Sequence, residues 1–176
     1  MSESVRKHRS EAPEKLRFAV FTVSTSRYAK FRKGQVFDDV SGDLLEDLIE
    51  KVGYSVGFRI VISDDKKMIE QAACKALCDK SLDVLIFCGG TGVTATDVTI
   101  ESLSPLFDKV LPGFGEIFRR LSYDELGSAA VLSRAVAGIA QKKVVYCIPG
   151  SPNAVRLCAE KLILPEASHI LKHAKE

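Results

Sequence analysis

The stretch CGGTGVTATD, residues 88–97, concentrates the residue types with which proteins hold phosphate groups. Glycine lacks a side chain, so its backbone N–H can approach an anion closely and its φ angle can be positive. The glycines are Gly89, Gly90 and Gly92, and the hydroxyl donors are Thr91, Thr94 and Thr96. The stretch matches neither the phosphate loop that ends in Gly-Lys-Ser/Thr nor the GxGxxG dinucleotide pattern. It predicts a phosphate-binding turn, with an ordinary strand-to-helix turn as the alternative.

Two aspartates belong to the same prediction. Asp97 ends the glycine-rich stretch, and Asp64 follows an earlier apolar segment. Each one alone fits a helix cap, because residues 94–97 match the capping-box pattern and Asp64 precedes a helix expected from about Lys66. Together beside a phosphate they suit Mg²⁺, which prefers oxygen ligands. A carboxylate against a polyphosphate would repel it without a cation, so the pair predicts a magnesium ion that arrives with a nucleotide.

The segment PGSPN, residues 149–153, is a second candidate for anion binding. Ser151 followed by Pro152 is typical of a helix N-cap and first turn, and the same arrangement presents free N–H groups to an anion. The three histidines, His8, His169 and His173, lie in the terminal segments and are assigned no chemistry. No Ser-His-Asp or Cys-His set can be placed along the chain.

The cysteines do not predict a disulfide framework, because their number is odd and they lack close paired spacing. They are Cys74, Cys78, Cys88, Cys147 and Cys158. Cys74 and Cys78 lie four residues apart on a predicted helix and could share a metal ion, but no further Cys or His lies nearby. We therefore favour small, buried apolar side chains over a metal site.

Apolar runs and helical spacing predict the elements that position these residues. Strands are expected at 16–24, 54–62, 82–87 and 142–148, and helices at about 43–51, 66–77, 114–127 and 152–164. A polar loop is expected at 25–42, and 130–140 fits either a strand or a helix. Strands that alternate with amphipathic helices form right-handed βαβ units. The expected fold class is therefore α/β with a mostly parallel sheet.

Four polar clusters follow four of the predicted strands. They are the segments 24–27, 63–65, 89–92 and 149–153. In open α/β sheets, ligands bind outside the carboxyl ends of the strands. We therefore expect the four clusters to meet along one edge of the sheet and to form a site there.

Composition limits the remaining possibilities. The chain has 176 residues, of which 46% are hydrophobic and 27% charged, which favours one globular domain at 16–176. A net charge of +2 gives no support for a nucleic-acid or membrane partner, and no apolar run approaches the roughly 18 residues of a membrane span. Residues 1–15 are expected to be a mobile charged arm, whose basic cluster at 6–9 fits a solvated tail. Because this arm is no secretory signal, we expect a cytoplasmic protein.

Residues 16–164 resemble the MoaB/MogA family of molybdenum-cofactor biosynthesis proteins, the molybdopterin adenylyltransferases, and most closely its MoaB branch. The stretches that carry the resemblance are GGTG followed by Asp97, SPLFDKVLPGFGEIFRRLSYDELG from Ser104, LSRAVAGIA from Leu132 and IPGSP from Ile148. The fold that the resemblance implies is a three-layer αβα sandwich around the mostly parallel sheet, the molybdopterin-binding-like fold. The implied reaction is attack by the terminal phosphate of molybdopterin on the α-phosphate of ATP.

The resemblance also assigns roles to residues. Asp64 and Asp97 match the catalytic, Mg²⁺-associated carboxylates of the family. The glycine loop, with the turn at Pro149, Gly150 and Ser151, matches the phosphate and pterin subsites. Candidates for the nucleotide side are Ser24, Ser26, Asp39, Ser41 and Gly42. Family members form trimers or hexamers, which implies a homo-oligomer.

The chain departs from the family pattern at three positions. They are Thr25, where aspartate is common, Ser63, where proline is frequent, and Val93, where proline or leucine is frequent. None of these departures removes a proposed catalytic group. A non-catalytic homologue that binds molybdopterin or a nucleotide during cofactor assembly is the alternative function.

Overall fold

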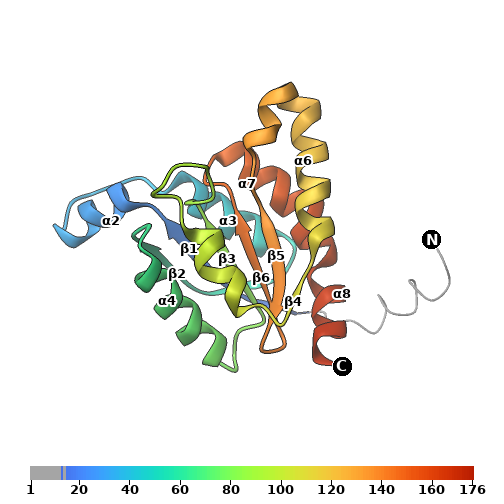
Figure 1. Ribbon diagram of the computed structural model, residues 1–176. Coiled ribbons are helices and arrows are strands. Elements are labelled where there is room, and N and C mark those ends of the chain that lie inside the picture. The colour runs from blue at the N-terminus through green and yellow to red at the C-terminus, as the bar shows by residue number, and fades with distance from the viewer. Residues whose placement is uncertain (1–12, 14) are drawn as a thin grey trace.

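A six-stranded sheet forms the centre of the molecule in the computed structural model, which describes residue 13 and residues 15–176 (Figure 1). In order across the sheet the strands are β2 (Ser55–Ile62), β1 (Arg17–Val23), β3 (Val84–Cys88), β6 (Lys143–Ile148), β5 (Val136–Ala140) and β4 (Lys109–Val110). The first four are parallel, and β5 runs antiparallel to both of its neighbours. The expected mostly parallel sheet is confirmed. The predicted basic cluster at 6–9 lies outside the described residues.

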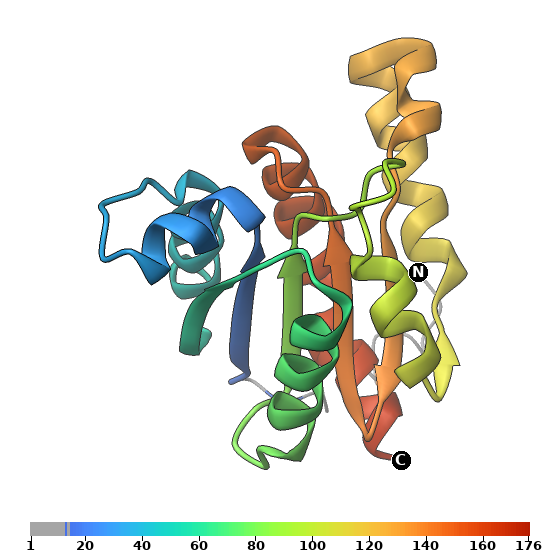
Figure 2. The same cartoon turned by 60° about the vertical axis from the view of Figure 1, so that its left-hand side comes forward.

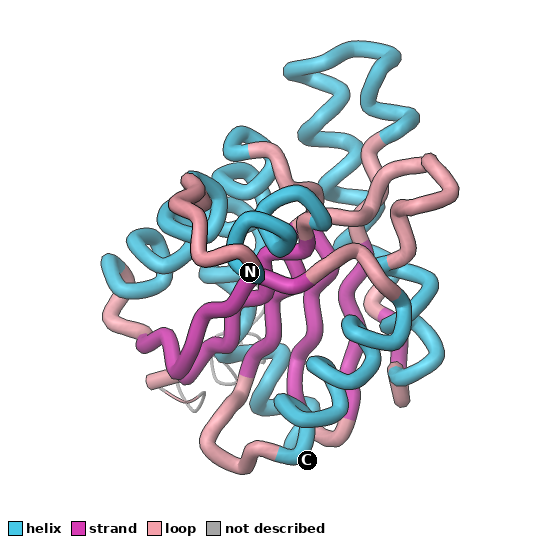
Figure 3. The backbone as a smooth tube through the Cα atoms, turned by 90° about the vertical axis from the view of Figure 1, so that its left-hand side faces the viewer, coloured by secondary structure: helices cyan, strands magenta, loops and turns pink. Residues whose placement is uncertain are grey.

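Helices cover both faces of this sheet (Figures 2 and 3). One face packs against α3 (Val40–Lys51), α6 (Pro112–Leu126), α7 (Pro152–Cys158) and α8 (Leu164–Lys175). The opposite face packs against α4 (Lys66–Cys78) and α5 (Thr99–Leu103). The expected three-layer αβα sandwich is therefore confirmed.

Strand β1 shows why the sheet needs helices on both sides. Phe18 and Val20 point into one apolar cluster, and Ala19 and Phe21 point into the other. Successive side chains of a strand point to opposite faces, so a run that is apolar at every position must be buried twice. The ring of Phe21 stacks on Phe87 of β3, with a centroid separation of 4.2 Å.

The segment 25–42, expected to be a polar loop, is partly helical. Helix α2 (Thr25–Arg32) begins there, capped by the side chain of Ser24, which accepts from the backbone N–H of Arg27. No residue of α2 is buried, so it has no apolar stripe that periodicity could detect. Helix α3 also begins three residues earlier than expected, because Asp39 caps it by accepting from Gly42 N.

The C-terminal helix is longer than the sequence predicts. It was expected to end near Leu164, just before Pro165, yet helical structure continues to Lys175. A π-helical turn, η3 (Ala159–Ile163), joins α7 to α8. Pro165, which has no backbone N–H to donate, follows this π-helical turn directly in the first turn of α8.

The ambiguous segment 130–140 is divided between two elements. Its first residues end the 3₁₀ helix η2 (Gly127–Leu132), and its last residues form β5. Gly127 ends α6 with a φ of 61°, as its position predicted. Together, α6 and η2 rise beyond the carboxyl ends of the strands (Figure 2). This projection supplies a wall beside the edge where the polar clusters were expected to meet.

The structure corrects the interpretation of two cysteines. Cys74 and Cys78 are exposed on α4, although burial was the favoured prediction, because the apolar stripe of that helix runs through Ile69, Ala73 and Ala76. The other three cysteines are buried, as expected. No helix among the described residues is long and apolar enough to cross a membrane.

Because both faces of the sheet are buried, shortening a side chain of a central strand should destabilise the protein. Replacing Ile86, which is fully buried in β3, by alanine should lower the free energy of unfolding by about 2–5 kcal/mol, because it leaves a cavity that the layers cannot close. Val36→Ala is the matched control, since Val36 is 92% exposed in the segment before α3 and should change stability by less than about 0.5 kcal/mol. Urea unfolding measures both values. Equal losses in the two variants would contradict the packing described here.

Candidate functional site

The four polar clusters meet at the carboxyl edge of the sheet, as the strand order predicted. Two backbone hydrogen bonds anchor clusters to the ends of neighbouring strands, and a third hydrogen bond links one cluster to α3. The backbone N–H of Gly89 donates to Ile148 O at 2.9 Å, and that of Ser24 donates to Ile62 O at 2.8 Å. The hydroxyl of Ser41 donates to Gly150 O at 2.8 Å, which links the start of α3 to the turn after β6. Segments far apart in the sequence therefore form one continuous edge.

The glycine loop after β3 has the backbone geometry that its composition predicts. Gly90 has a φ of 61°, in the left-handed region that favours glycine. A Cβ there would also lie 2.6 Å from both carboxylate oxygens of Asp64, and a Cβ on Gly92 would lie 2.7 Å from Asp97 Oδ2. The loop thus passes directly against both predicted carboxylates. Only residues without side chains allow that approach.

Asp64 is not a helix cap, contrary to the alternative interpretation. The cap of α4 is its neighbour Asp65, whose Oδ1 accepts from Met68 N at 2.9 Å. Asp64 instead turns to the glycine loop and accepts from Val98 N at 3.3 Å. Burial raises the pKa of this carboxyl group, and the negative charges of Asp97 and Glu101 raise it further.

Asp97 makes one half of a capping box. Its Oδ2 accepts from Thr94 N at 2.9 Å, but the Thr94 hydroxyl also donates to the same carboxylate instead of capping a helix. No helix begins at this turn, and α5 starts only at Thr99. The hydrogen bond from the Thr94 hydroxyl is the largest cause that lowers the pKa of Asp97, and backbone N–H groups and Arg134 lower it further.

The site therefore holds two carboxylates with opposite electrostatic surroundings on either side of one glycine loop. Hard oxygen ligands of this kind fit Mg²⁺, which is commonly bound through one or two carboxylates together with substrate phosphates and water. Across residues 15–176 no group of three or more His, Cys, Asp or Glu side chains is arranged to hold a metal ion by itself. A cation at Asp64 and Asp97 would thus take its remaining ligands from a substrate and from water.

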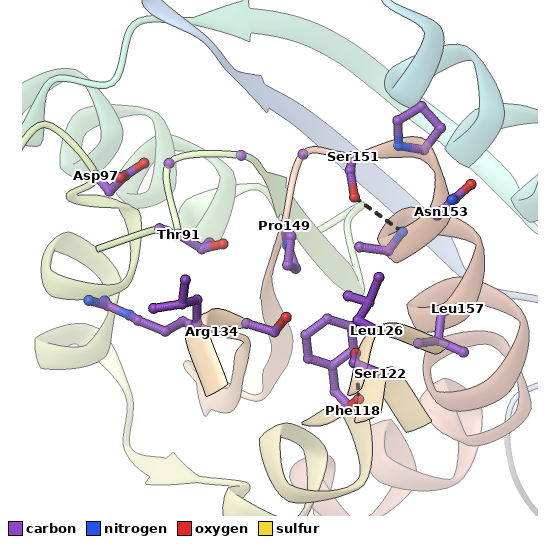
Figure 4. A pocket seen from close by; sticks show the side chains of 18 of the residues that line it. Thr91, Asp97, Phe118, Ser122, Leu126, Arg134, Pro149, Ser151, Asn153 and Leu157 are labelled. Atoms are coloured by element: carbon purple, nitrogen blue, oxygen red, sulfur yellow. Dashed lines mark hydrogen bonds between the residues drawn. The ribbon is translucent and has the colours of Figure 1, made fainter. Parts of the chain in front are cut away.

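A pocket of about 550 Å³ opens beside the glycine loop (Figure 4). Its polar side is formed by Gly89–Gly92, Asp97 and the turn at Pro149–Ser151. Its apolar side includes Phe118 and Leu126 of α6 and Leu157 of α7. A pocket of this size and mixed lining suits a ring system with a phosphate at one end.

Several pocket residues were not predicted from the sequence. They are Phe118, Ser122, Glu125, Leu126, Leu132, Ser133, Arg134, Ala154 and Leu157. Phe118, Ser122 and Glu125 recur at helical spacing on one face of α6, which was a usable signal. Arg134 lies in the stretch that carried the family resemblance, although no role was assigned to it. Arg134 forms an ion pair with Glu101.

Five predicted nucleotide-side residues lie outside the lining of this pocket. Asp39 is buried and accepts from the Thr22 hydroxyl at 2.8 Å while pairing with Arg59. Ser41 and Gly42 are buried in the first turn of α3. Ser24 and Ser26 lie at the start of α2, with their hydroxyl oxygens 3.3 Å apart. Contact of these residues with a nucleotide stays a prediction.

Ser151 combines the two interpretations that the sequence left open. Its side chain accepts from Ala154 N at 3.3 Å, so it caps α7, and Pro152 occupies the first turn. The same turn borders the pocket, with Ser151 next to the glycine loop (Figure 4). The cap therefore fixes the turn that borders the pocket.

A three-layer α/β fold with a pocket suited to a phosphate-bearing ring system defines the class of protein, and comparisons with known proteins identify its family. Residues 19–169 match a family model described as "Probable molybdopterin binding domain". The chain is 46% identical over 176 aligned residues to a protein of Pyrococcus furiosus named "Molybdopterin adenylyltransferase", covering 98% of this chain and 99% of that one. It is 41% identical to "Molybdenum cofactor biosynthesis protein B" of Bacillus subtilis, covering 98% of each.

A solved structure extends the similarity to three dimensions. It is described as a tungsten cofactor synthesizing protein MoaB from Pyrococcus furiosus, with a TM-score of 0.82, 44% identity, and coverage of 94% of this chain and 100% of that one. The chain therefore belongs to the MoaB/MogA family of molybdenum-cofactor biosynthesis proteins, which confirms the resemblance seen in its sequence.

The surroundings of the two carboxylates predict separate titrations. Replacing Thr94 by alanine should raise the pKa of Asp97, because it removes the hydroxyl that stabilises the ionised form. Replacing Asp97 by asparagine should lower the pKa of Asp64, because a nearby negative charge disappears. Carboxyl carbon NMR shifts followed against pH measure both.

Thr96→Ala is the matched control for these titrations. The Thr96 hydroxyl contacts that of Thr94 at 3.0 Å, and no hydrogen bond joins it to the Asp97 carboxylate in the described structure. It should therefore leave the Asp97 pKa close to that of the wild type. An Asp97 titration that Thr94→Ala does not move would disprove the assigned cause.

Proposed function

We propose that this chain transfers the adenylyl group of ATP to molybdopterin, giving adenylyl-molybdopterin and pyrophosphate. An oxygen of the terminal phosphate of molybdopterin bonds to the α-phosphorus of ATP, and the bond between that phosphorus and the pyrophosphate oxygen breaks. Relatives named "Molybdopterin adenylyltransferase" and "Probable molybdopterin adenylyltransferase", 46% and 43% identical over nearly the whole chain, support this reaction. The observation that carries the proposal is the glycine loop packed between Asp64 and Asp97 at the edge of the pocket.

The reaction joins two anions, so the site has to offset their repulsion. The backbone N–H groups of the glycine loop and of the turn at Gly150 and Ser151 are suited to receive phosphate oxygens. Arg134 adds a positive charge on the pocket wall. Positioning and electrostatic stabilisation carry most of the rate in such transfers, which agrees with a site that has no evident covalent nucleophile.

Asp64 and Asp97 are proposed to hold a magnesium ion when ATP binds. The ion would supply positive charge at the phosphates, and the two side chains would fix its position relative to the loop. The ordered hydrogen bonds to Asp97 support this role, because they hold its carboxylate ionised and in one orientation. The residues at the start of α2 and α3 would lie on the nucleotide side, and the pocket under α6 would take the pterin.

The test is formation of adenylyl-molybdopterin from ATP, Mg²⁺ and molybdopterin. Asp97→Asn and Asp64→Asn should each lower the rate at least about 100-fold, because each removes a charge needed in the transition state. Asp65→Asn is the matched control, since asparagine caps a helix as well as aspartate does and the residue adjoins Asp64 without facing the loop. It should keep the wild-type rate.

Two outcomes would contradict this assignment. Equal rates for the wild type and Asp97→Asn would reduce Asp97 to a residue that only orders its turn. A folded wild type that binds Mg²⁺ and ATP without forming product would make the chain a non-catalytic binding homologue. Thermal unfolding of every variant shows whether it is folded, so that a lower reaction rate can be distinguished from a loss of structure.

We also propose that the protein works in the cytoplasm as a homo-oligomer, a trimer or a hexamer. Exposed apolar side chains on α6 and η2 support self-association, because contact with another copy would remove them from water. They are Ile117, Tyr123 and Val131. Light scattering during gel filtration should give a mass of about three or six times the 19.2 kDa of one chain. A mass of 19.2 kDa at every concentration would contradict the proposal.

A further inference from the structure

Ser41, in the first turn of α3, holds one peptide group of the turn that borders the pocket. It is 2% exposed, and its hydroxyl donates to Gly150 O at 2.8 Å. Gly150 and Ser151 line the pocket, whereas Ser41 is not part of its lining. Ser41 therefore contacts the turn from the side of α3, and not from the side where a ligand would bind.

The geometry of the peptide group makes this contact matter for the pocket. In a planar trans peptide the C=O and the following N–H point in opposite directions, so the position of Gly150 O sets the direction of the Ser151 N–H. Because Ser41 holds the carbonyl, that N–H is directed away from α3. Among the described residues, no acceptor receives a hydrogen bond from the backbone N–H of Ser151. The turn therefore keeps this donor available for a ligand.

Gly150 makes an external hydrogen bond necessary. A Cβ at this position would lie 3.2 Å from Gly89 Cα, so the close packing of the two turns favours a residue without a side chain. Glycine also leaves the backbone more freedom to rotate than any other residue does. A rotated peptide group would present a carbonyl oxygen to the pocket, and this oxygen would repel a phosphate oxygen. The hydroxyl of Ser41 selects the opposite orientation.

Asp39 keeps Ser41 in place. This buried carboxylate caps α3, accepts from the Thr22 hydroxyl at 2.8 Å and lies 3.5 Å from Arg59 Nε. These contacts fix the first turn of α3 to β1 and β2, on one side of β3, whereas the turn that borders the pocket follows β6 on its other side. Ser41 is thereby held across the end of β3, within reach of that turn.

The preceding peptide group of the turn is held in the same manner by a weaker donor. The buried thiol of Cys88 donates to Pro149 O at 3.7 Å. Burial raises the pKa of this thiol to about 12, so the sulfur keeps its hydrogen at neutral pH. Side-chain donors therefore hold two successive carbonyl groups of the turn.

We propose that Ser41 is a positioning residue, which directs the Ser151 N–H into the pocket so that it donates to a phosphate oxygen of a substrate. The inference rests on the proposed function, in which this turn receives a phosphate group. Ser41 acts through the peptide group that joins Gly150 to Ser151. Asp39 acts one step further away, because it fixes the turn of helix from which Ser41 reaches.

The experiment measures the binding of inorganic pyrophosphate to the full chain in the presence of Mg²⁺, followed by the backbone amide NMR signals of Gly150 and Ser151. Ser41→Ala should weaken this binding about tenfold and reduce the shift of the Ser151 signal, because the peptide group loses the hydrogen bond that orients it. Ser41→Thr keeps the hydroxyl and should bind as the wild type does. Ser41→Cys has a similar size and a weaker donor, and its affinity should lie between those of the wild type and Ser41→Ala.

Ser168→Ala is the matched control. The Ser168 hydroxyl also donates to a backbone carbonyl, Pro13 O, at 2.8 Å, and Ser168 does not line the pocket. Both alanine variants lose one hydrogen bond of the same length and should lose similar stability in thermal unfolding. Ser168→Ala should nevertheless bind pyrophosphate as the wild type does.

Two results would overturn the role of Ser41. One is wild-type affinity for pyrophosphate in Ser41→Ala, and the other is a wild type whose Gly150 and Ser151 signals do not respond to pyrophosphate. Binding needs no turnover, so the proposed function is tested separately. A wild type that binds pyrophosphate without forming adenylyl-molybdopterin would contradict that function, while weaker binding in Ser41→Ala than in Ser168→Ala would still support the role of Ser41.

Discussion

The close approach of backbone to carboxylate at Gly90 is the constraint on which the site depends. A side chain at this position would occupy the space of both Asp64 oxygens and of the Thr99 hydroxyl, which lies 2.4 Å from the Cβ position. Thr99 in turn donates to Gly89 O and binds Gly90 O through its backbone. The loop after β3 and the start of α5 are thereby fixed to each other and to the end of β2. The position of Asp64 against the loop follows from this packing, and Gly92 allows the same close approach to Asp97.

The two aspartates of the site differ in their electrostatic surroundings. Asp64 sits where burial disfavours its charge, and Asp97 sits among donors that favour its charge. The pKa of Asp64 is raised because its carboxyl group is partly buried against the glycine loop. The pKa of Asp97 is lowered because a hydroxyl group and backbone N–H groups donate to its carboxylate. A magnesium ion bound with the nucleotide would stabilise the ionised form of Asp64, because it would supply the positive charge that the surroundings of this carboxylate lack.

The pocket is built from a different part of the chain than the phosphate cradle. The cradle comes from loops at the carboxyl ends of parallel strands, and the apolar wall comes from the projection of α6 and η2 past those ends. Such a division suits a reaction between two substrates. Backbone groups can hold phosphates of either one, while an apolar wall gives the ring of one substrate a defined place. It also places large apolar side chains on the outside of the projection, where another copy of the chain can cover them.

The sequence by itself determined a mostly parallel sheet and the edge where polar residues gather. Strands with continuous apolar runs must be buried on both faces, and the polar residues follow the ends of those strands. It also singled out the glycine loop and Asp97, since neighbouring residues form a turn whose chemistry is local. Only the tertiary structure decided that Asp64 faces the loop while Asp65 caps the helix, because two adjacent aspartates have equal capping propensity. The pocket wall from Phe118, Arg134 and Leu157 likewise depended on where whole helices end and turn. Those positions result from packing over long separations, which local patterns do not record.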